Sequence, residues 1–233
     1  MAETNEPVGR LPTFADVEAA AKRLAPIVSR TPVLESPVVN EMLGCRILIK
    51  AECLQRTGSF KVRGAYNKIA QIPEDIRKKG VVAYSSGNHA QGVARAAKLL
   101  GIPARIVMPA DAPKVKMDNT RRDGAIVVPY ERKNANRVAI SEGLVKDTGG
   151  TMVPPYNDPD IMAGQGTLGL EFAEHVEKAV KLAFDEYKSV IEPSGAIGLA
   201  AIMAEPQKFR GRTVGIIATG GNVDSDAFAR MIR

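Results

Sequence analysis

A regular alternation of short apolar runs and helix-like stretches after residue 67 limits the folds open to this chain. The apolar, β-branched runs are GVVAYSS, PARIVMP, AIVVPY and TMVPPY. Between them lie an Ala-rich stretch that ends at Gly101, a second stretch near Lys114, and NANRVAISEGLVKDTGG. Strands that alternate with helices of about 10–15 residues are typical of a parallel sheet covered by helices. We therefore expect residues 67–155 to form a small three-layer α/β domain.

The residues on either side of this block follow a different pattern. PTFADVEAAAKRLAPIV has apolar residues at helical spacing, with Thr13 as the expected N-cap and Asp16 three residues later. RILIKAE and RTVGIIATGGNVDSD contain the only further predicted strands, and the rest of the C-terminal third is predicted to be helical. Two strands are too few for a stable independent sheet. Residues 1–66 and 156–233 are therefore expected to form a second, larger domain whose sheet is incomplete.

Composition argues against several classes of function. Lys and Arg exceed Asp and Glu by 32 to 26, but the basic residues are dispersed and the chain has no Trp and only 5% aromatic residues. Base-stacking surfaces need aromatic side chains, so we expect no nucleic-acid binding. No apolar run approaches the ~18 residues of a membrane span, and no signal-peptide pattern is evident at the N-terminus, so no membrane association is expected.

The cysteines and histidines argue against disulfide bonds and against a zinc site. Cys45 and Cys53 flank an apolar run and form no CxxC pair. We expect two reduced, partly buried thiols, which fits a cytoplasmic protein. With only two His in the chain, a His-based zinc site is not expected, and no metal ligands are predicted.

Four short motifs have the residue types of a ligand-binding site. They are GSFKVRG around Lys61, SSGNHAQG, EPSGA and ATGGNVD. In α/β sheets, ligands bind beyond the carboxyl ends of strands, and the second and fourth motifs follow predicted strands. The segment SSGNH offers backbone donors, a hydroxyl and an amide to an anion such as a carboxylate. Each motif alone has an ordinary explanation, such as a solvated lysine or a helix-capping asparagine. Because four such motifs occur in one chain, we interpret them together as a ligand-binding site.

Taken together, these motifs resemble those of the fold-type-II pyridoxal-phosphate enzymes, and among them the threonine/serine dehydratase and serine racemase family. SFKVRGA, SSGNHAQGVA, GQGT (164–167), EPSGA and GGNVD occur in the family's order, and the resemblance extends over nearly the whole chain. The resemblance implies an α/β fold of the tryptophan-synthase-β-like type, with two three-layer open-sheet domains. It also implies pyridoxal 5′-phosphate as cofactor and a small hydroxy amino acid as substrate.

The resemblance assigns roles to individual residues. Lys61 corresponds to the Schiff-base lysine, whose amine must be kept neutral by burial or nearby cations, because free lysine with a pKa near 10.4 is a poor nucleophile. Phe60 is expected beside the cofactor, Asn88 at the pyridoxal 3′-oxygen and Thr219 at the pyridine nitrogen. The loop expected to hold the substrate carboxylate consists of Ser85, Ser86, Gly87, Asn88 and His89.

Two reactions remain open. The favoured prediction is an L-threonine/L-serine ammonia-lyase, in which Lys61 removes the α-proton and loss of the hydroxyl leads to a 2-oxo acid and ammonia. A neutral hydroxyl such as that of Thr219 at the pyridine nitrogen suits elimination. Ser86 indicates the alternative, a serine or 3-hydroxyaspartate racemase. Serine racemases use a serine at this position as the second acid–base catalyst, whereas many dedicated dehydratases have alanine.

One part of the family pattern is missing from the sequence. No GGG run occurs, and EFAEHVE is followed directly by KAVKLAFDEYKSVIEPSGA, where relatives have the glycine-rich turn that binds the cofactor phosphate. The racemases' cation-binding carboxylates belong to the same stretch. A second alternative is therefore a non-catalytic relative that acts as a binding or assembly module. A reduced large domain would also expose apolar strand faces, so we expect a homodimer.

Overall fold

The computed structural model describes residues 10–35, 37–38, 48–133, 135–193, 196–212, 223 and 225–233. The chain divides into two compact units, Met1–Thr31 with Glu52–Thr167, and Pro32–Ala51 with Leu168–Arg233. Each unit is described by itself. The expected assignment of residues 67–155 to a small domain and of both ends to a cofactor domain stays a prediction.

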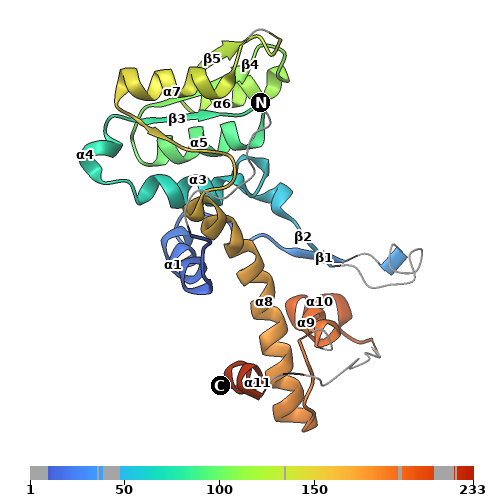
Figure 1. Ribbon diagram of the computed structural model, residues 1–233. Helices are drawn as coiled ribbons and strands as arrows, with labels where there is room; N and C mark the ends of the chain where they lie inside the picture. Colours follow the sequence, from blue (N-terminus) through green and yellow to red (C-terminus); the bar gives the residue numbers. More distant parts are fainter. Residues whose placement is uncertain are drawn as a thin grey trace. The chain divides into compact units, whose positions relative to one another are not determined.

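The first unit contains a parallel sheet of four strands in the order β5-β4-β3-β6 (Figure 1). The strands are β3 (Val81–Tyr84), β4 (Ala104–Pro109), β5 (Ile126–Tyr130) and β6 (Thr151–Met152). Val81 in the central strand β3 lies opposite Ala104 on one side and Thr151 on the other. All three strand pairs are parallel, so the predicted α/β class is confirmed.

Helices cover both faces of this sheet. Helices α5 (Asn88–Leu99) and α7 (Arg137–Thr148) lie on opposite faces of the sheet (Figure 1). Helix α6 (Lys114–Arg122) is joined to α5 by a side-chain hydrogen bond. Gly101 and Gly149, which follow α5 and α7, have φ values of 66° and 67°. This left-handed conformation ends both helices at low cost because glycine has no Cβ. The predicted three layers are therefore present.

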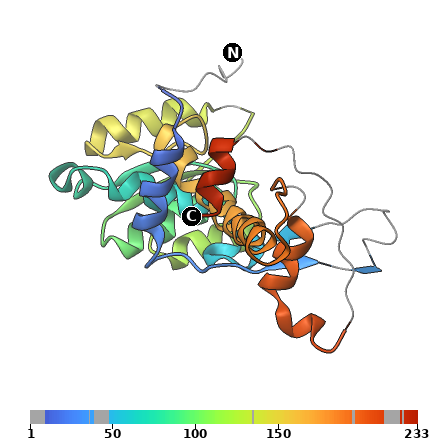
Figure 2. The same cartoon turned by 90° about the horizontal axis from the view of Figure 1, so that it is seen from below.

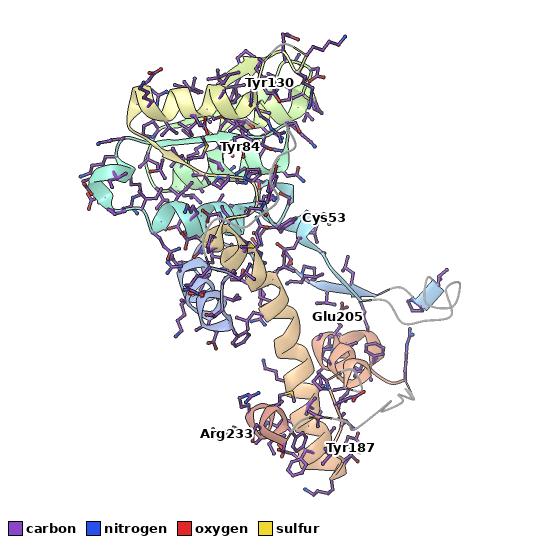
Figure 3. All side chains as sticks on the ribbon, in the orientation of Figure 1. Cys53, Tyr84, Tyr130, Tyr187, Glu205 and Arg233 are labelled. Carbon is purple, nitrogen blue, oxygen red and sulfur yellow. The ribbon has the colours of Figure 1, made fainter. Side chains whose placement is uncertain are left out.

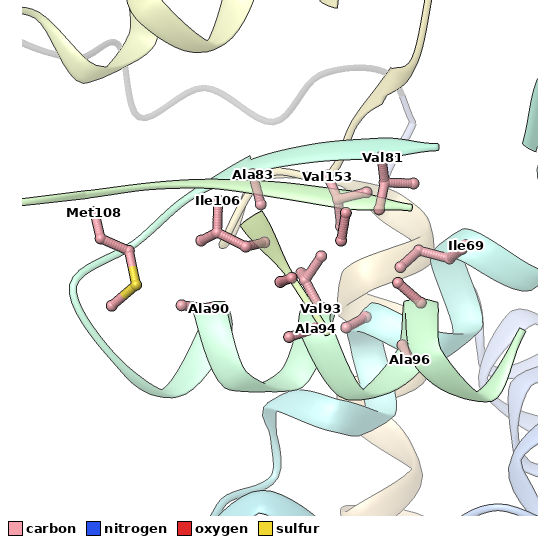
Figure 4. Close-up of a cluster of buried hydrophobic side chains, with 14 of the residues drawn as sticks. Ile69, Val81, Ala83, Ala90, Val93, Ala94, Ala96, Ile106, Met108 and Val153 are labelled. Carbon is pink, nitrogen blue, oxygen red and sulfur yellow. The ribbon is translucent and has the colours of Figure 1, made fainter. Parts of the chain in front are cut away.

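The core of the first unit lies between the sheet and α5 (Figure 4). Alanines and a valine of α5 face the apolar side chains of the strands. The fully buried members of this cluster include Val81, Ala83, Ala90, Val93, Ala96, Ile106, Met108 and Val153. Small side chains on α5 allow its backbone to approach the sheet closely.

The N-terminal helix α1 (Phe14–Leu24) begins as predicted. The Thr13 hydroxyl accepts a hydrogen bond from the Asp16 amide at 3.4 Å, and the Thr13 amide donates to Asp16 Oδ2 at 2.7 Å. The helix ends at Leu24, short of Val28, which the apolar spacing had included. After it come the short 3₁₀ turns η1 (Glu52–Leu54) and η2 (Arg56–Gly58), then α3 (Lys61–Ala70) and α4 (Glu74–Arg77).

The second unit has little sheet. β1 (Val33–Glu35) pairs antiparallel with β2 (Leu48–Lys50), and the sequence had indicated only the second of these. α8 (Pro159–Tyr187) continues as a single helix through the point where the family's glycine-rich segment was expected. Its later turns pack with α9 (Ile197–Ala204) and α11 (Ser225–Met231) around Val180 (Figures 1 and 2). α10 (Pro206–Phe209) completes the unit. The strand expected before Thr219 lies outside the described residues.

Two further expectations concern the surface. Cys53 is exposed (Figure 3), so the prediction of a partly buried thiol is wrong at this position, because η1 buries Glu52 instead. Cys45 lies outside the described residues. Among the helices that the structure describes, none combines the length and the apolar character needed to cross a membrane.

Candidate active site

The strand order creates a switch point between β3 and β6. From β3 the sheet continues through β4 to β5 on one side, whereas β6 is added on the other side. In open α/β sheets, ligands bind beyond the carboxyl ends of the strands at such a point. The segments that follow β3 and β6 here are 85–89 and 153–155. Both segments lie close to Lys61, as the contacts below show.

Lys61 is the first residue of α3, and its amine lies beside these two segments. Nζ donates a hydrogen bond to the Pro155 carbonyl at 2.7 Å and lies 5.2 Å from the centroid of the Phe60 ring. Burial lowers the pKa of the Lys61 amine, because desolvation disfavours its charged form. A lysine whose pKa is lowered is a better nucleophile and a better proton acceptor at neutral pH. Burial thus favours the neutral amine that a Schiff-base role of Lys61 requires.

The turn before Lys61 has an unusual backbone. Thr57 and Gly58 are both left-handed, with φ values of 68° and 69°. A β-branched residue adopts this conformation only when surrounding structure imposes it. The hydroxyl oxygens of Thr57 and Ser59 are buried and have no hydrogen-bond partner. The turn therefore places two hydroxyl groups without partners just before the lysine.

The loop after β3 leads directly into α5 (Asn88–Leu99). The Gly87 amide donates to Ser85 Oγ at 3.1 Å, and no side chain caps the first turn of the helix. Ser86 and Asn88 are exposed, while Ser85 is partly buried. The loop thus leaves backbone donors of a helix N-terminus beside exposed hydroxyl and amide groups, an arrangement that suits an anion.

His89 is the buried member of this loop. Its Nε2 lies 3.0 Å from the Val153 carbonyl, so Nε2 carries the hydrogen, because a carbonyl oxygen only accepts. Burial is the largest cause of a lowered His89 pKa; the hydrogen bond to Val153 opposes it, the nearby Lys61 charge adds to it, and the pKa is about 4. The imidazole is therefore neutral at pH 7, and its buried Nδ1 has no partner. As a neutral ring bonded to Val153, it offers no positive charge to a substrate carboxylate.

Two glycines of neighbouring helices, Gly92 and Gly164, pack closely against α3, the helix that carries Lys61. A Cβ atom on Gly92 of α5 would lie 3.0 Å from the Lys61 carbonyl carbon. On another side of α3, a Cβ on Gly164 would lie 2.7 Å from the Arg63 carbonyl oxygen and 2.8 Å from the Gly64 Cα. Real Cβ atoms do not approach other atoms as closely as 2.7 Å, so position 164 requires glycine, whereas a Cβ at position 92 would be tight and would need the Lys61 backbone to shift slightly. Three of the motifs, SFKVRG, SSGNHAQG and GQGT, therefore meet at α3.

A buried ion pair holds the same helix from within. Arg63 is fully buried, and its Nε and Nη2 donate to the two carboxylate oxygens of Glu52 at 2.7 and 2.8 Å. Glu52 also accepts from the Thr31 hydroxyl at 2.6 Å, and Arg63 Nη1 donates to the Thr167 hydroxyl at 3.2 Å. Such a bidentate pair is strong and directional. The network ties the start of α3 to η1 and to α8.

This network was not predicted from the sequence. Arg63 and Thr167 lie within the motifs but had no expected role, and Glu52 lies outside them. One feature of the sequence could have indicated the network. Arg63 follows the proposed catalytic lysine by two residues, at a helical position with apolar neighbours, so a buried arginine with an acidic partner could have been expected there. Thr219 and the glycines that follow it, assigned to the pyridine side, lie outside the described residues. The roles assigned to Lys61, Phe60, Ser85, Ser86, Gly87, Asn88 and His89 stay predictions.

A family model described as pyridoxal-phosphate dependent enzyme matches residues 24–185, which is more than half of the chain. The chain belongs to this family. Its cofactor is pyridoxal 5′-phosphate. The solved structure of maize serine racemase has a TM-score of 0.69 to this chain at 27% identity, and the match covers 95% of this chain and 97% of the maize chain. The predicted fold type is therefore confirmed.

Curated relatives include ammonia-lyases and the serine racemase of Schizosaccharomyces pombe, which is 43% identical over 166 residues and covers 71% of this chain and 51% of the relative. An L-threo-3-hydroxyaspartate ammonia-lyase of Pseudomonas sp is 34% identical over 317 residues, covering 96% of this chain and 99% of the relative. The L-threonine ammonia-lyase of Thermotoga maritima is 45% identical over 187 residues, covering 80% of this chain. That match covers only 45% of the Thermotoga protein, so the chain spans less than half of its length.

The alignment with the Pseudomonas relative supports the expectation that an internal segment is missing from this chain. It extends over 317 residues, although the whole chain has 233. Both proteins take part over almost their full lengths. The relative therefore carries an internal stretch with no counterpart in this chain, as the sequence comparison of motifs had indicated.

The residues at the switch point fit one part of the cofactor. A lysine of lowered pKa suits its aldehyde carbon, and the aromatic ring of Phe60 lies beside this lysine. The unpartnered hydroxyls of Thr57 and Ser59 provide further donors next to it. A glycine-rich phosphate turn is absent from the sequence. The described residues thus fit the covalent side of the cofactor, and the sequence lacks the glycine-rich turn that the family resemblance leads one to expect for the phosphate.

Proposed function

We propose that this chain is an ammonia-lyase that uses pyridoxal phosphate to eliminate water from a small hydroxy amino acid, giving a 2-oxo acid and ammonia. The observation that carries the proposal is the partly buried Lys61 amine, whose pKa is lowered beside an anion-binding loop at the switch point. L-Threonine and L-serine are the substrates of the favoured version. The names of relatives over this part of the chain support the reaction class.

The chain's own residues have distinct parts in this reaction. Bound cofactor supplies an electron sink for the substrate α-carbon. The amine of Lys61, whose pKa burial lowers, accepts the α-proton in its neutral form, and the Pro155 carbonyl orients this amine through their hydrogen bond. The loop 85–89 binds the substrate carboxylate through its backbone donors, Ser85 and Asn88. Neutral His89 keeps the loop in place by its bond to the Val153 carbonyl.

Racemisation of serine or 3-hydroxyaspartate is a second candidate because Ser86 is exposed on the same loop. An exposed hydroxyl at this position is available to exchange a proton with a bound ligand. Chiral chromatography of the residual substrate separates the two reactions. A lyase leaves only the L-enantiomer, whereas a racemase produces the D-enantiomer before the substrate is exhausted.

The decisive experiment measures cofactor binding by absorbance. We expect a visible band when pyridoxal phosphate is added to the purified protein, with loss of the band on borohydride treatment and in Lys61→Ala. Lys78→Ala is the matched control, because Lys78 is exposed and pairs only with the neighbouring Glu74 among the described residues. A wild-type protein that stays colourless at saturating cofactor would support the remaining candidate, a non-catalytic binding or assembly module.

Assembly as a homodimer is part of the proposal. In the second unit, Leu34, Tyr187 and Val190 are 41%, 70% and 50% exposed. Large exposed apolar side chains favour contact with a partner surface. Sedimentation velocity at micromolar concentration tests this, and a single monomeric species would contradict it.

A further inference from the structure

A small polar cavity of the first unit is bordered by α1, by the C-terminal half of α3 and by the start of α8 (Figure 1). Its volume is about 70 Å³. One water molecule needs roughly 10–15 Å³ of such space, so the cavity has room for several waters or for one small ligand. Apart from two alanines and a proline, its lining is polar and consists of Arg10, Asp16, Arg23, Asn67, Gln71 and Asp160.

Two of the charged lining residues satisfy each other. Arg10 Nη1 and Nη2 donate to Asp16 Oδ2 and Oδ1 at 2.8 and 2.9 Å. Such a bidentate pair uses both carboxylate oxygens and half of the guanidinium fork. Asp16 also accepts from the Thr13 amide at the start of α1. This pair therefore adds no net charge to the cavity.

Arg23 has no such partner. Its Nη1 donates to Asn67 Oδ1, which is a neutral acceptor. Within the part of the chain that the structure describes, no carboxylate pairs with the Arg23 guanidinium. The side chain is partly buried, and a charge that is removed from water without a counter-charge is unfavourable. Because the planar fork of arginine matches a carboxylate, the cavity offers a site for a carboxylate at Arg23.

Asp160 supplies the opposite charge. Its Oδ1 accepts from Gln71 Nε2 at 3.0 Å, and its Oδ2 lies 3.3 Å from Lys68 Nζ. The same lysine lies closer to Asp158, at 2.7 Å from Oδ2. One amine is thus shared by two carboxylates, and Asp160 has the longer contact. The Asp160 carboxylate therefore retains capacity to accept a hydrogen bond from a further cation.

The two charges without full partners are held near each other by one buried side chain. Asn67 is 1% exposed, and its amide accepts from Arg23 at Oδ1 and donates to the Asp160 carbonyl from Nδ2 at 2.7 Å. A ligand that satisfies both residues needs an anionic and a cationic group only a few atoms apart. The zwitterion of an α-amino acid carries both groups on one carbon. A phosphate or a simple carboxylate would leave the Asp160 charge unmatched.

We propose that this cavity binds a small α-amino acid as a zwitterion, with its carboxylate on Arg23 and its ammonium group on Asp160. The volume limits the ligand to a small side chain. The site is separate from Lys61, because Asn67 and Gln71 follow Lys61 by about 9 and 15 Å along the helix axis at 1.5 Å per residue. The inference therefore goes beyond the proposed function and does not depend on it.

Binding to the cofactor-free protein tests the site, because without cofactor an amino acid forms no covalent bond at Lys61. Glycine is the probe, and acetate and methylamine each carry only one of its two charges. Calorimetric titration should show that glycine binds at least tenfold more tightly than either. Arg23→Gln should weaken glycine binding at least tenfold through the loss of a charge-assisted contact. Asp160→Asn should weaken glycine binding but not acetate binding, so that the preference for glycine disappears.

Lys22→Gln is the matched control, because Lys22 is an exposed cation next to Arg23 on α1 and does not line the cavity. It should bind glycine as wild type does, and circular dichroism should show that all variants are folded. Equal affinity of wild type for acetate and glycine would overturn the amino-acid assignment and leave an anion site. Wild type that does not bind glycine, or an Arg23→Gln protein that binds it normally, would overturn the site.

Discussion

The two units of the chain differ in how completely they preserve a fold-type-II enzyme. The first has a four-stranded parallel sheet, a buried ion pair and a lysine at a switch point. In the described part of the second, the only sheet consists of two three-residue strands, and helices pack around a separate small cluster. Lys61, the proposed Schiff-base residue, thus lies in the unit that has the larger sheet. The difference indicates that a chain without the internal stretch of its Pseudomonas relative still forms the parallel sheet and the buried surroundings of this lysine.

The largest expected effect comes from restoring the missing stretch. Inserting the corresponding segment of the Pseudomonas relative after residue 177 should supply the backbone donors that bind the phosphate. We expect cofactor affinity to rise about a hundredfold or more, because several charge-assisted hydrogen bonds are gained at once. Equilibrium dialysis with pyridoxal phosphate measures this. The same insert with its glycine-rich turn replaced by alanines is the control, and equal affinity in both would contradict the explanation.

A second prediction concerns the ion pair that distinguishes the first unit. Glu52→Gln leaves the buried guanidinium of Arg63 without a charged partner, so the free energy of unfolding should fall by about 3–5 kcal/mol. Urea denaturation followed by circular dichroism measures the change. Glu74→Gln is the control, because Glu74 pairs with Lys78 at the exposed surface and its loss should cost less than about 0.5 kcal/mol. Similar losses in both variants would contradict the role of the buried pair.

The fold was largely predictable because its signals are local. Each strand of the sheet appears as a short apolar run, and Gly101 and Gly149 mark helix ends within a few residues of the pattern they terminate. The strand Val33–Glu35 was missed, whereas Leu48–Lys50, which has the same length, was found within the longer run RILIKAE. The sequence therefore identifies such short strands where a longer apolar run contains them.

The contacts of the site were not predictable in the same way. Lys61 bonds to the carbonyl of a residue 94 positions away, and Arg63 to a hydroxyl 104 positions away. Nothing in the sequence near either residue specifies these partners, because they come together only after the sheet has formed. Residue types in a motif indicated the chemistry of Lys61. They could not indicate that burial lowers the pKa of its amine.

A third prediction uses the close crossing of α3 and α8. Gly164→Ala places a Cβ within 2.8 Å of backbone atoms of α3, so one of the helices must shift. We expect a loss of about 1–3 kcal/mol in the free energy of unfolding, typical of overpacking. Gly143→Ala on α7 is the matched control, because no atom lies within 4 Å of its Cβ position. There alanine should stabilise the helix by about 0.5–1 kcal/mol. Equal effects at the two sites would contradict the crossing.

The last prediction is a pH dependence of stability that originates in His89. Its pKa is about 4 in the folded protein against an ordinary value of 6.5, so the unfolded chain binds a proton more readily. Stability from the neutral ring is therefore fully present above about pH 6.5 and declines as the pH falls towards 4. The urea midpoint of wild type should decrease over this range, and that of His89→Gln should decrease less. Gln keeps a donor for the Val153 carbonyl but does not titrate. Equal pH slopes in the two proteins would show that other groups, chiefly carboxylates, cause the acid sensitivity of this unit.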